Sequence, residues 1–462
     1  MLRARGMDET IKQGMDGAKL QDVMRTALPG DKVVELAYEL GVIERQSLIE
    51  LDKLVNALVL VSRTPAGGRQ ADVMRAYVKA SDGDPVRGAF YRRFNDALER
   101  LLLRLLRDNL AEVARDPLLL PEAIAGVRDW HIIDSETVKL HRSLKDRYPG
   151  TGDYAAVKVH KTYSIGRHNM VDFHFSPARE HDSLHLEVTE EMRGLGLLFD
   201  LGYASHDRLR ACRDHEVPFV CKLKDGWNAR LETVHAGEVA GLLAGSDLAD
   251  AVAFGRLDCK DGVIDADVTL SCGARAYGLR LVALELPDKG LCVFLTNLPR
   301  ERYPARVVGD LYRLRWEIEK SNKLDKSDLC LDQLDCRKVC SAHTMLYASL
   351  LGACIVGRLV HADHCALAAA KAPLTRGPVH ARLLAMALAS MHAALTQALA
   401  GGDDDREWDR IARKLAHGSR DPNWRRRPSV LDTMLGFTGP AGRRRREKAT
   451  PAASFRSVAA SK

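Results

Sequence analysis

Strand-like and helix-like patterns alternate between residues 131 and 224, and this order constrains the fold more than any other feature of the chain. Apolar or alternating runs bounded by turn residues predict strands at 131–134, 156–165, 170–176, 195–200 and 217–223. A helix is expected at 182–193. The order is typical of a mixed α/β sheet with helices packed against it.

The sequence on either side of this segment divides into further regions. Residues 226–304 contain alternating runs separated by glycine-containing turns, which predict an inserted antiparallel sheet. Ala305 begins a long helical pattern that reaches about Leu331. We therefore expect a helical N-terminal region at 1–128, an α/β core at 129–225 and 305–345, a β-strand insertion at 226–304, a helical C-terminal region at 346–438 and a basic disordered tail at 439–462.

The composition excludes several classes of protein. With 462 residues, 46% of them hydrophobic and 28% charged, the chain is neither disordered nor collagen-like nor a small disulfide scaffold. Its ten cysteines form no Cys-x-x-Cys pair, so we expect reduced thiols rather than a zinc site. The apolar run Thr344–Gly357 is too short for a membrane span, and the N-terminus lacks a secretory signal. We expect a cytoplasmic protein that does not contact a membrane.

Basic residues are concentrated near the C-terminus. From Gly401 onward there are 15 Lys and Arg against 8 Asp and Glu, a difference of 15 − 8 = +7 that equals the whole net charge. Seven of these residues form the runs 425–427 and 443–446. Such runs attract polyanions, nucleic acid foremost, although a solvated basic tail explains them equally well.

The N-terminal region offers two further DNA-binding hypotheses. Residues 36–50 faintly resemble a helix-turn-helix, but the spacing after Gly41 favours a plain helical pair. An amphipathic helix from Phe90 to Leu105 carries a row of arginines, Arg92, Arg93, Arg100 and Arg104. These side chains either neutralise DNA phosphates or form a solvated helix face.

Two aspartates follow the predicted strands at positions where a site is expected. Asp134 ends the first strand and Asp200 ends the fourth. Ligands of such sheets gather at the carboxyl ends of the strands. Carboxylates there, without cysteine or histidine partners, predict a site for Mg²⁺ or Mn²⁺, which prefer oxygen ligands.

The helical pattern after Ala305 carries a polar stripe. Tyr312, Arg315, Glu319 and Lys326 fall on one side of an ideal helix. A phenol, a guanidinium, a carboxylate and an ammonium make a poor core face. They suit a site where a carboxylate completes a metal centre and the cations hold phosphate oxygens.

These blocks resemble the insertion-sequence-four family of DDE transposases. The spacing Tyr-x2-Arg-x3-Glu-x6-Lys resembles the family's YREK signature. The segments Ile-Ile-Asp-Ser-Glu-Thr around Asp134 and Leu-Leu-Phe-Asp-Leu-Gly-Tyr around Asp200 resemble its two catalytic aspartate motifs, and 219–224 resembles the strand that follows. The resemblance covers about residues 85–345. It departs from the family at 320–323, where Lys-Ser-Asn-Lys replaces the aromatic residues of many relatives.

The resemblance implies a fold and an activity. The fold is a ribonuclease-H-like core interrupted by a β insertion. The catalytic metal ligands are Asp134, Asp200 and Glu319, which hold two Mg²⁺ or Mn²⁺ ions. The DNA contacts come from Tyr312, Arg315 and Lys326. The implied activity is a cut-and-paste DNA transposase that cleaves transposon ends at their terminal inverted repeats and transfers them into target DNA. The joining of two ends suggests a homodimer.

Neighbouring residues compete for some of these roles. Glu136 shares the strand parity of Asp134, whereas Glu317 is expected to face away from Glu319. Trp316 is expected in the core. His181 and His185 are spaced as metal ligands on a helix can be, but no third ligand is near in the sequence, so solvent-facing or capping roles are expected.

Two other functions remain as alternatives. One is a nuclease of the same fold that cuts DNA without strand transfer. The other is a non-catalytic DNA-binding derivative or transposition inhibitor, which the loss of an acidic ligand would have favoured.

Overall fold

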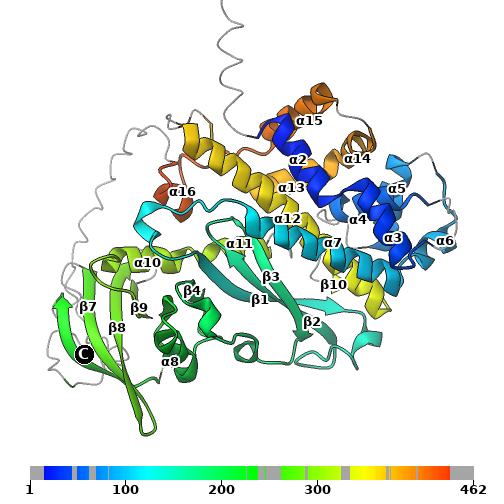
Figure 1. The fold of residues 1–462 in the computed structure, drawn as a ribbon. Helices are drawn as coiled ribbons and strands as arrows, with labels where there is room; N and C mark the ends of the chain where they lie inside the picture. The colour runs from blue at the N-terminus through cyan, green and yellow to red at the C-terminus, as the bar shows by residue number, and fades with distance from the viewer. Residues whose placement is uncertain are drawn as a thin grey trace, which may run out of the picture.

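The computed structural model describes residues 15–43, 49–61, 69–81, 83–224, 226–237, 245, 262–286, 290–323, 333–370, 374, 376–401 and 404–437. Within these ranges the chain forms one ten-stranded mixed sheet with helices on both of its faces (Figure 1). The predicted mixed α/β fold class is therefore confirmed. The basic run 443–446 and Lys326 lie outside the described residues.

The chain before the sheet is helical. Gly41 adopts a φ of +71°, which ends the second helix of this region, and the Asn95 side chain accepts a hydrogen bond from the Leu98 amide (3.1 Å) to begin the last one. The arginine-rich pattern from Phe90 is thus split between two helices. The helices are α2 (Gly17–Ala27), α3 (Gly30–Glu39), α4 (Leu51–Val61), α5 (Gln70–Ala80), α6 (Arg87–Arg92) and α7 (Asp96–Arg115).

The core of the sheet has the strand order β3-β2-β1-β4-β5. Strands β1, β4 and β5 run parallel, and β2 runs antiparallel between β1 and β3. The strands are β1 (Trp130–Leu140), β2 (Ala155–Ser164), β3 (Asn169–Pro177), β4 (Gly196–Phe199) and β5 (Phe219–Lys222), with β10 (Gln333–Leu334) parallel to the far end of β1.

The expected β insertion extends this same sheet. Strand β9 pairs antiparallel with β5, with Val220 opposite Thr296, and the sheet continues through β8 and β7 to β6. Cross-strand hydrogen bonds therefore join the insertion to the core, and the segment 226–304 does not stand apart from it. The strands are β6 (Ala229–Ala236), β7 (Val263–Cys272), β8 (Arg275–Leu286) and β9 (Gly290–Thr296).

The helix expected at 182–193 is absent from these fully described residues. Two single 3₁₀ turns, η3 (Asp182–His185) and η4 (Glu190–Met192), replace it. Leu186 and Val188 are both buried, and their spacing of two residues requires extended backbone to bring both side chains to the core. A regular helix, α8 (His206–Asp214), follows β4 instead.

Different helices cover the two faces of the sheet. Ile132 and Leu198 belong to the apolar cluster under α10 (Ala305–Arg313), whereas Ile133 and Phe199 belong to the cluster under α8. In Figure 1, α7 and α12 lie above the sheet and α8 lies below it. We call the face that carries Ile132 and α10 the upper face, and the opposite one the lower face.

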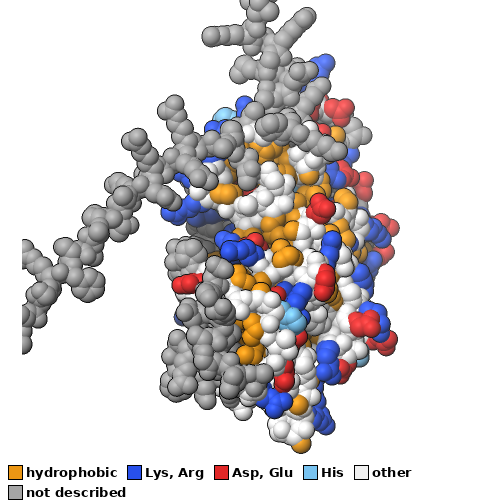
Figure 2. All heavy atoms as spheres, turned by 90° about the vertical axis from the view of Figure 1, so that its left-hand side faces the viewer, with side chains coloured by type: hydrophobic (Ala, Val, Ile, Leu, Met, Phe, Trp, Pro, Cys, Tyr) orange, Lys and Arg blue, Asp and Glu red, His pale blue; other side chains and the backbone are white. Residues whose placement is uncertain are grey.

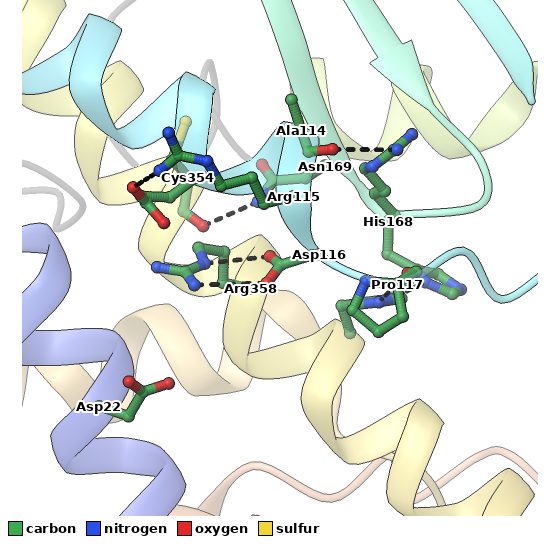
Figure 3. A network of polar contacts seen from close by, with 12 residues as sticks. Asp22, Ala114, Arg115, Asp116, Pro117, His168, Asn169, Cys354 and Arg358 are labelled. Atoms are coloured by element: carbon green, nitrogen blue, oxygen red, sulfur yellow. Dashed lines mark hydrogen bonds and ion pairs between the residues drawn. The ribbon is translucent and has the colours of Figure 1, made fainter.

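The long helix α12 (Val339–Ala370) runs through the helical layer, and the boundary expected after residue 345 falls inside it. By length and composition it could cross a membrane, but 89% of its most apolar window is buried by the rest of the protein. Arg358 within it pairs with Asp116 at 3.0 Å, and Asn169 donates to the Cys354 carbonyl at 2.9 Å (Figure 3). These contacts tie α12 to the end of α7 and to the β2–β3 turn.

The C-terminal helices pack with the N-terminal ones. Leu20 of α2 and Ile411 belong to the same apolar cluster, which also includes Val157 and Val159 of β2. The first and last quarters of the described chain thus share one core. The helices are α13 (Ala381–Ser390), α14 (His392–Ala400), α15 (Asp405–Gly418) and α16 (Val430–Met434).

Candidate active site

The pairing of β1 with β4 brings the two predicted aspartates together. Asp134 does not end its strand as predicted, because β1 continues to Leu140 along β2. The parallel pairing with β4, however, ends at Ile133 opposite Phe199. Asp134 and Asp200 each follow one of these partners, so both lie at the point where the two strands part.

The long helix predicted from Ala305 is broken before it reaches the carboxylate. It consists of α10 and α11 (Trp316–Lys323), and the amide of Arg315 bonds to the Tyr312 carbonyl (3.1 Å) in a tight turn between them. The turn still leaves Arg315 beside Glu319, with which it forms an ion pair. Three of the four stripe residues are therefore brought together, and the fourth lies outside the described residues.

The charges of these residues act on one another. Burial raises the pKa of Asp134, and the nearby carboxylates of Asp200 and Glu319 raise it further. Burial alone would lower the pKa of the Arg315 guanidinium, but Tyr312, Glu319 and Asp200 raise it instead. The direct contacts here are the ion pair of Arg315 with Glu319 and the hydrogen bond from Asn322 of α11 to Asp134, so α11 lies against the point where β1 and β4 part.

The buried side chain of Tyr312 lies next to Arg315. Its ring is buried, contacts Phe294 at a centroid distance of 5.0 Å, and has Arg315 5.7 Å and Lys222 5.6 Å from its centre. Two cations over one ring form cation–π contacts and leave positive charge next to the carboxylates. This arrangement suits a phosphate that approaches a metal centre.

A second layer of polar residues, which the sequence did not reveal, holds Asp134. The side-chain amide of Asn322 donates to Asp134 Oδ2 (2.9 Å), and its oxygen accepts from the Lys161 ammonium (3.3 Å). Lys161 lies opposite Asp134 in the β1–β2 register and also pairs with Glu136. Glu136 shares the face of Asp134, as its parity indicated, but this lysine engages it. Glu317 pairs with Lys320 (2.8 Å) instead of joining the carboxylates.

Trp316 is not in the core as predicted, since 48% of its surface is exposed. Leu314 and Ile318 are buried, and a residue midway between them points to the opposite side of the helix. The break between α10 and α11 thus places an indole at the surface within three residues of Glu319.

The expectation for the two histidines after β3 is wrong in one respect. His181 accepts a hydrogen bond from the Ser183 amide (3.2 Å), which is a capping role. His185, in contrast, has two further imidazoles beside it, those of His160 and His174. Both come from the β2–β3 hairpin, so no linear spacing could have revealed them.

Most of the arginines proposed for phosphate contacts form hydrogen bonds or ion pairs within the chain itself. Arg93 donates to the Val42 carbonyl (3.0 Å) and Arg100 to the Leu40 carbonyl (3.2 Å), while Arg104 pairs with Asp108 (3.0 Å). Figure 2 shows basic and acidic side chains interspersed, with hydrophobic ones among them, on the face it presents. The described residues of that face therefore carry no continuous basic surface.

The donor set is suited to hard cations. Asp134, Asp200 and Glu319 offer only oxygen atoms, and burial, together with repulsion from the other two carboxylates, raises the pKa of Asp134. Mg²⁺ and Mn²⁺ prefer such oxygen ligands, and a bound cation would relieve the repulsion. The donor types therefore fit a divalent metal centre, and the three carboxylates would have to draw together on binding, because in the described residues their oxygens do not all lie within 4.8 Å of one another.

Comparisons with known proteins find transposases. Residues 128–355 match the family model of the transposase DDE domain. The chain is 26% identical over 248 residues to InsL of insertion sequence element IS186A from Escherichia coli strain K12, itself inferred to be a transposase, and to the transposase of insertion sequence element IS421 from Escherichia coli. The matches cover 46% of this chain and 63% and 62% of those relatives, less than two thirds of their length.

A comparison of structures finds the piggyBac transposase in its synaptic complex with hairpin DNA, at a TM-score of 0.43 and 10% identity over 88% of each chain. The family match spans the strands and α11, from which all three carboxylates come. Residues 128–355 of this chain are therefore similar to the transposase DDE domain family.

Proposed function

We propose that this chain is a cut-and-paste DNA transposase of the insertion-sequence-four type. The observation that carries the proposal is that the pairing of β1 with β4 brings Asp134 next to Asp200, while α11, which carries Glu319, contacts Asp134 through Asn322. Glu319 in turn pairs with Arg315. A family model for the transposase DDE domain covers all of these residues. The expected substrates are the terminal inverted repeats of the element and the target duplex, and the expected working form is a homodimer on paired ends.

Each residue has a defined task in this proposal. The three carboxylates would hold two Mg²⁺ or Mn²⁺ ions. Bound there, such ions activate a water or a 3′-hydroxyl and stabilise the leaving oxygen. Asn322 fixes the orientation of the Asp134 carboxylate by its hydrogen bond. Arg315 and Tyr312, with Lys326 beyond the described residues, contact the phosphates of the DNA end.

The test is cleavage of a labelled duplex that carries the end of the element, with Mg²⁺ present. Glu317 provides a matched control for Glu319, since it lies on the same helix but pairs with Lys320. We expect Glu319→Ala to abolish nicking while its DNA binding survives, and Glu317→Ala to nick normally. Nicking by Glu319→Ala would show that the carboxylate site is misassigned.

A second readout separates the alternatives. Supercoiled target DNA is added, and joined products are detected after cleavage. Joined products support a transposase, whereas cleavage without joining indicates a nuclease. DNA binding without cleavage under Mg²⁺ or Mn²⁺ would support the non-catalytic derivative.

A further inference from the structure

The lower face of the sheet carries three clustered imidazoles. His160 on β2 lies opposite His174 in the strand register, and His185 of η3 lies against both. Each of the three offers a ring nitrogen within 4.8 Å of those of the other two. In the part of the chain that the structure describes, no other group of histidine, cysteine and acidic residues meets this distance criterion. We propose that these histidines bind a divalent transition-metal ion of the Zn²⁺ or Co²⁺ type.

The nitrogen spacing suits such an ion. His174 Nε2 and His185 Nδ1 are 3.1 Å apart. Two nitrogens bound tetrahedrally at roughly 2.0–2.1 Å from zinc are about 3.3 Å apart. The rings stack, with His160 and His174 inclined by only 8°, so binding requires rings to turn about their Cβ–Cγ bonds. His174 is exposed and can turn, because a cavity of about 140 Å³ lies beside the cluster.

Polar groups lie beside two of the imidazoles, and His160 has one at each ring nitrogen, since its Nδ1 lies 3.4 Å from the Tyr203 hydroxyl. His185 Nε2 lies 3.1 Å from a carboxylate oxygen of Glu180, and His160 Nε2 lies 2.9 Å from the Ser176 hydroxyl. Metal-binding histidines commonly use their second nitrogen for a carboxylate or another polar group, which orients the ring. The Glu180 carboxylate would take this role for His185 once the ring turns, because the present contact does not have hydrogen-bond geometry.

The chemistry of this cluster differs from that of the carboxylates. Neutral imidazoles favour zinc, cobalt, nickel and copper, whereas Mg²⁺ requires oxygen ligands. The ammonium of Lys158 is near, but it pairs with Asp182 (2.9 Å). An ion at this place would link the β2–β3 hairpin to the segment before β4. It would therefore stabilise the connection that leads to Asp200 without entering the carboxylate site.

The experiment uses the full chain, without an affinity tag of histidines, and excess Mg²⁺ to fill the carboxylate site. Co²⁺ is titrated and the visible absorption of tetrahedral cobalt is recorded, and Zn²⁺ is then added to displace it. We expect one Co²⁺ per chain in the wild type. We expect the absorption to be lost in His174→Ala, and the affinity to fall about 10–100-fold in Glu180→Gln, as for partners of metal-bound histidines.

Two control variants give the experiment its specificity. His181→Ala removes a nearby imidazole outside the cluster, and Glu319→Gln alters the carboxylate site; both should bind Co²⁺ as the wild type does. Circular dichroism of each variant confirms that it folds, which is expected because His174 lies at the surface. The proposal is overturned if the wild type gives no cobalt absorption, or if His174→Ala and His181→Ala bind equally.

Discussion

Asp134 and Ser135 are neighbours on β1, but their side chains lie on opposite faces of the sheet, in different chemical surroundings. The upper face holds Asp134 and Asp200 where β1 and β4 part, and α11 brings Glu319, with its partner Arg315, against this point. The lower face gathers imidazoles from β2, β3 and η3, and Ser135 there donates to Asp182 (2.8 Å). The same sheet thus carries oxygen donors on one face and nitrogen donors on the other.

The difference shows how strand periodicity separates two functions. Successive side chains alternate between faces, so two sites within a few residues of sequence need not share any group. The elements that complete the two groups also differ. Glu319 of the upper face lies on helix α11, whereas His185 of the lower face lies in a loop with 3₁₀ turns. The predictions below ask how independent these two faces are.

The largest effect is expected from Asp134→Asn. Removing one charged ligand of the carboxylate group should lower the cleavage rate by about 10³-fold or more, since electrostatic terms at metal centres amount to several kcal/mol. Cobalt binding by the lower face should be unchanged. Parallel loss of both properties would show that the faces are not independent. Single-turnover cleavage and cobalt titration, both on the same preparation of Asp134→Asn, measure the two properties.

A buried histidine group offers a contrast to the exposed one. His168, His361 and His364 also cluster, and His364 pairs with Asp432 at 3.2 Å in the interior. Removing one partner of such a buried pair, as in Asp432→Asn, should lower the free energy of unfolding by about 3–5 kcal/mol. Denaturant unfolding measures this loss, and a change below about 1 kcal/mol would contradict a structural role.

The pair of His364 and Asp432 should make the free energy of unfolding depend on pH. Burial alone would lower the pKa of His364, but the hydrogen bond and charge of Asp432 raise it above the ordinary value. Burial would raise the pKa of Asp432, but His364 lowers it. The stabilisation from His364 is therefore full below the pKa of an unfolded histidine, about 6.5, and is lost as the pH rises through the raised value. The wild type and Asp432→Asn should differ more in unfolding free energy at pH 6 than at pH 9.

A smaller effect is expected from Asn322→Ala. The amide only orients Asp134, and groups that orient metal ligands typically contribute 10–100-fold to affinity or activity. We expect the cleavage rate of Asn322→Ala to fall by about 10–100-fold and to recover in part at higher Mg²⁺ concentration. Ser321→Ala, one position earlier on α11, is the matched control. A rate equal to that of the wild type in Asn322→Ala would remove this residue from the site.

The smallest effect is expected from Ser135→Ala. It breaks the hydrogen bond to Asp182 on the lower face and should lower the free energy of unfolding by about 1 kcal/mol. Cleavage should continue at the wild-type rate, because the hydroxyl points away from the carboxylates. A large loss of activity would show that the lower face controls the position of Asp134.

The sequence predicted the parts of this molecule that depend on local patterns. Apolar runs indicated the five core strands. Asp134 and Asp200, predicted at the ends of two of them, are brought together by the parallel pairing of β1 with β4. Glu319 was also correctly placed near them, although the helix that carries it is broken. The break between α10 and α11 could not be predicted, because the helical spacing of apolar residues continues across it.

Contacts between distant segments could not be predicted in this way. The pairing of His160 with His174 depends on the register of the hairpin, which an irregularity between Thr162 and Tyr163 shifts. Asn322 reaches Lys161 only because α11 crosses β1 at this particular point. Trp316 was assigned to the core by its apolar character alone, but the side of the helix that faces the sheet belongs to Leu314 and Ile318.

The continuous sheet has a mechanical consequence. Because β9 is hydrogen-bonded to β5, the outer strands β6–β8 are connected to the carboxylates through a ladder of backbone bonds. A module on a flexible linker can swing freely, whereas these strands can move relative to Asp200 only if the sheet twists or a ladder opens. A force on the outer edge is therefore transmitted to the strand that leads to Asp200 as elastic strain.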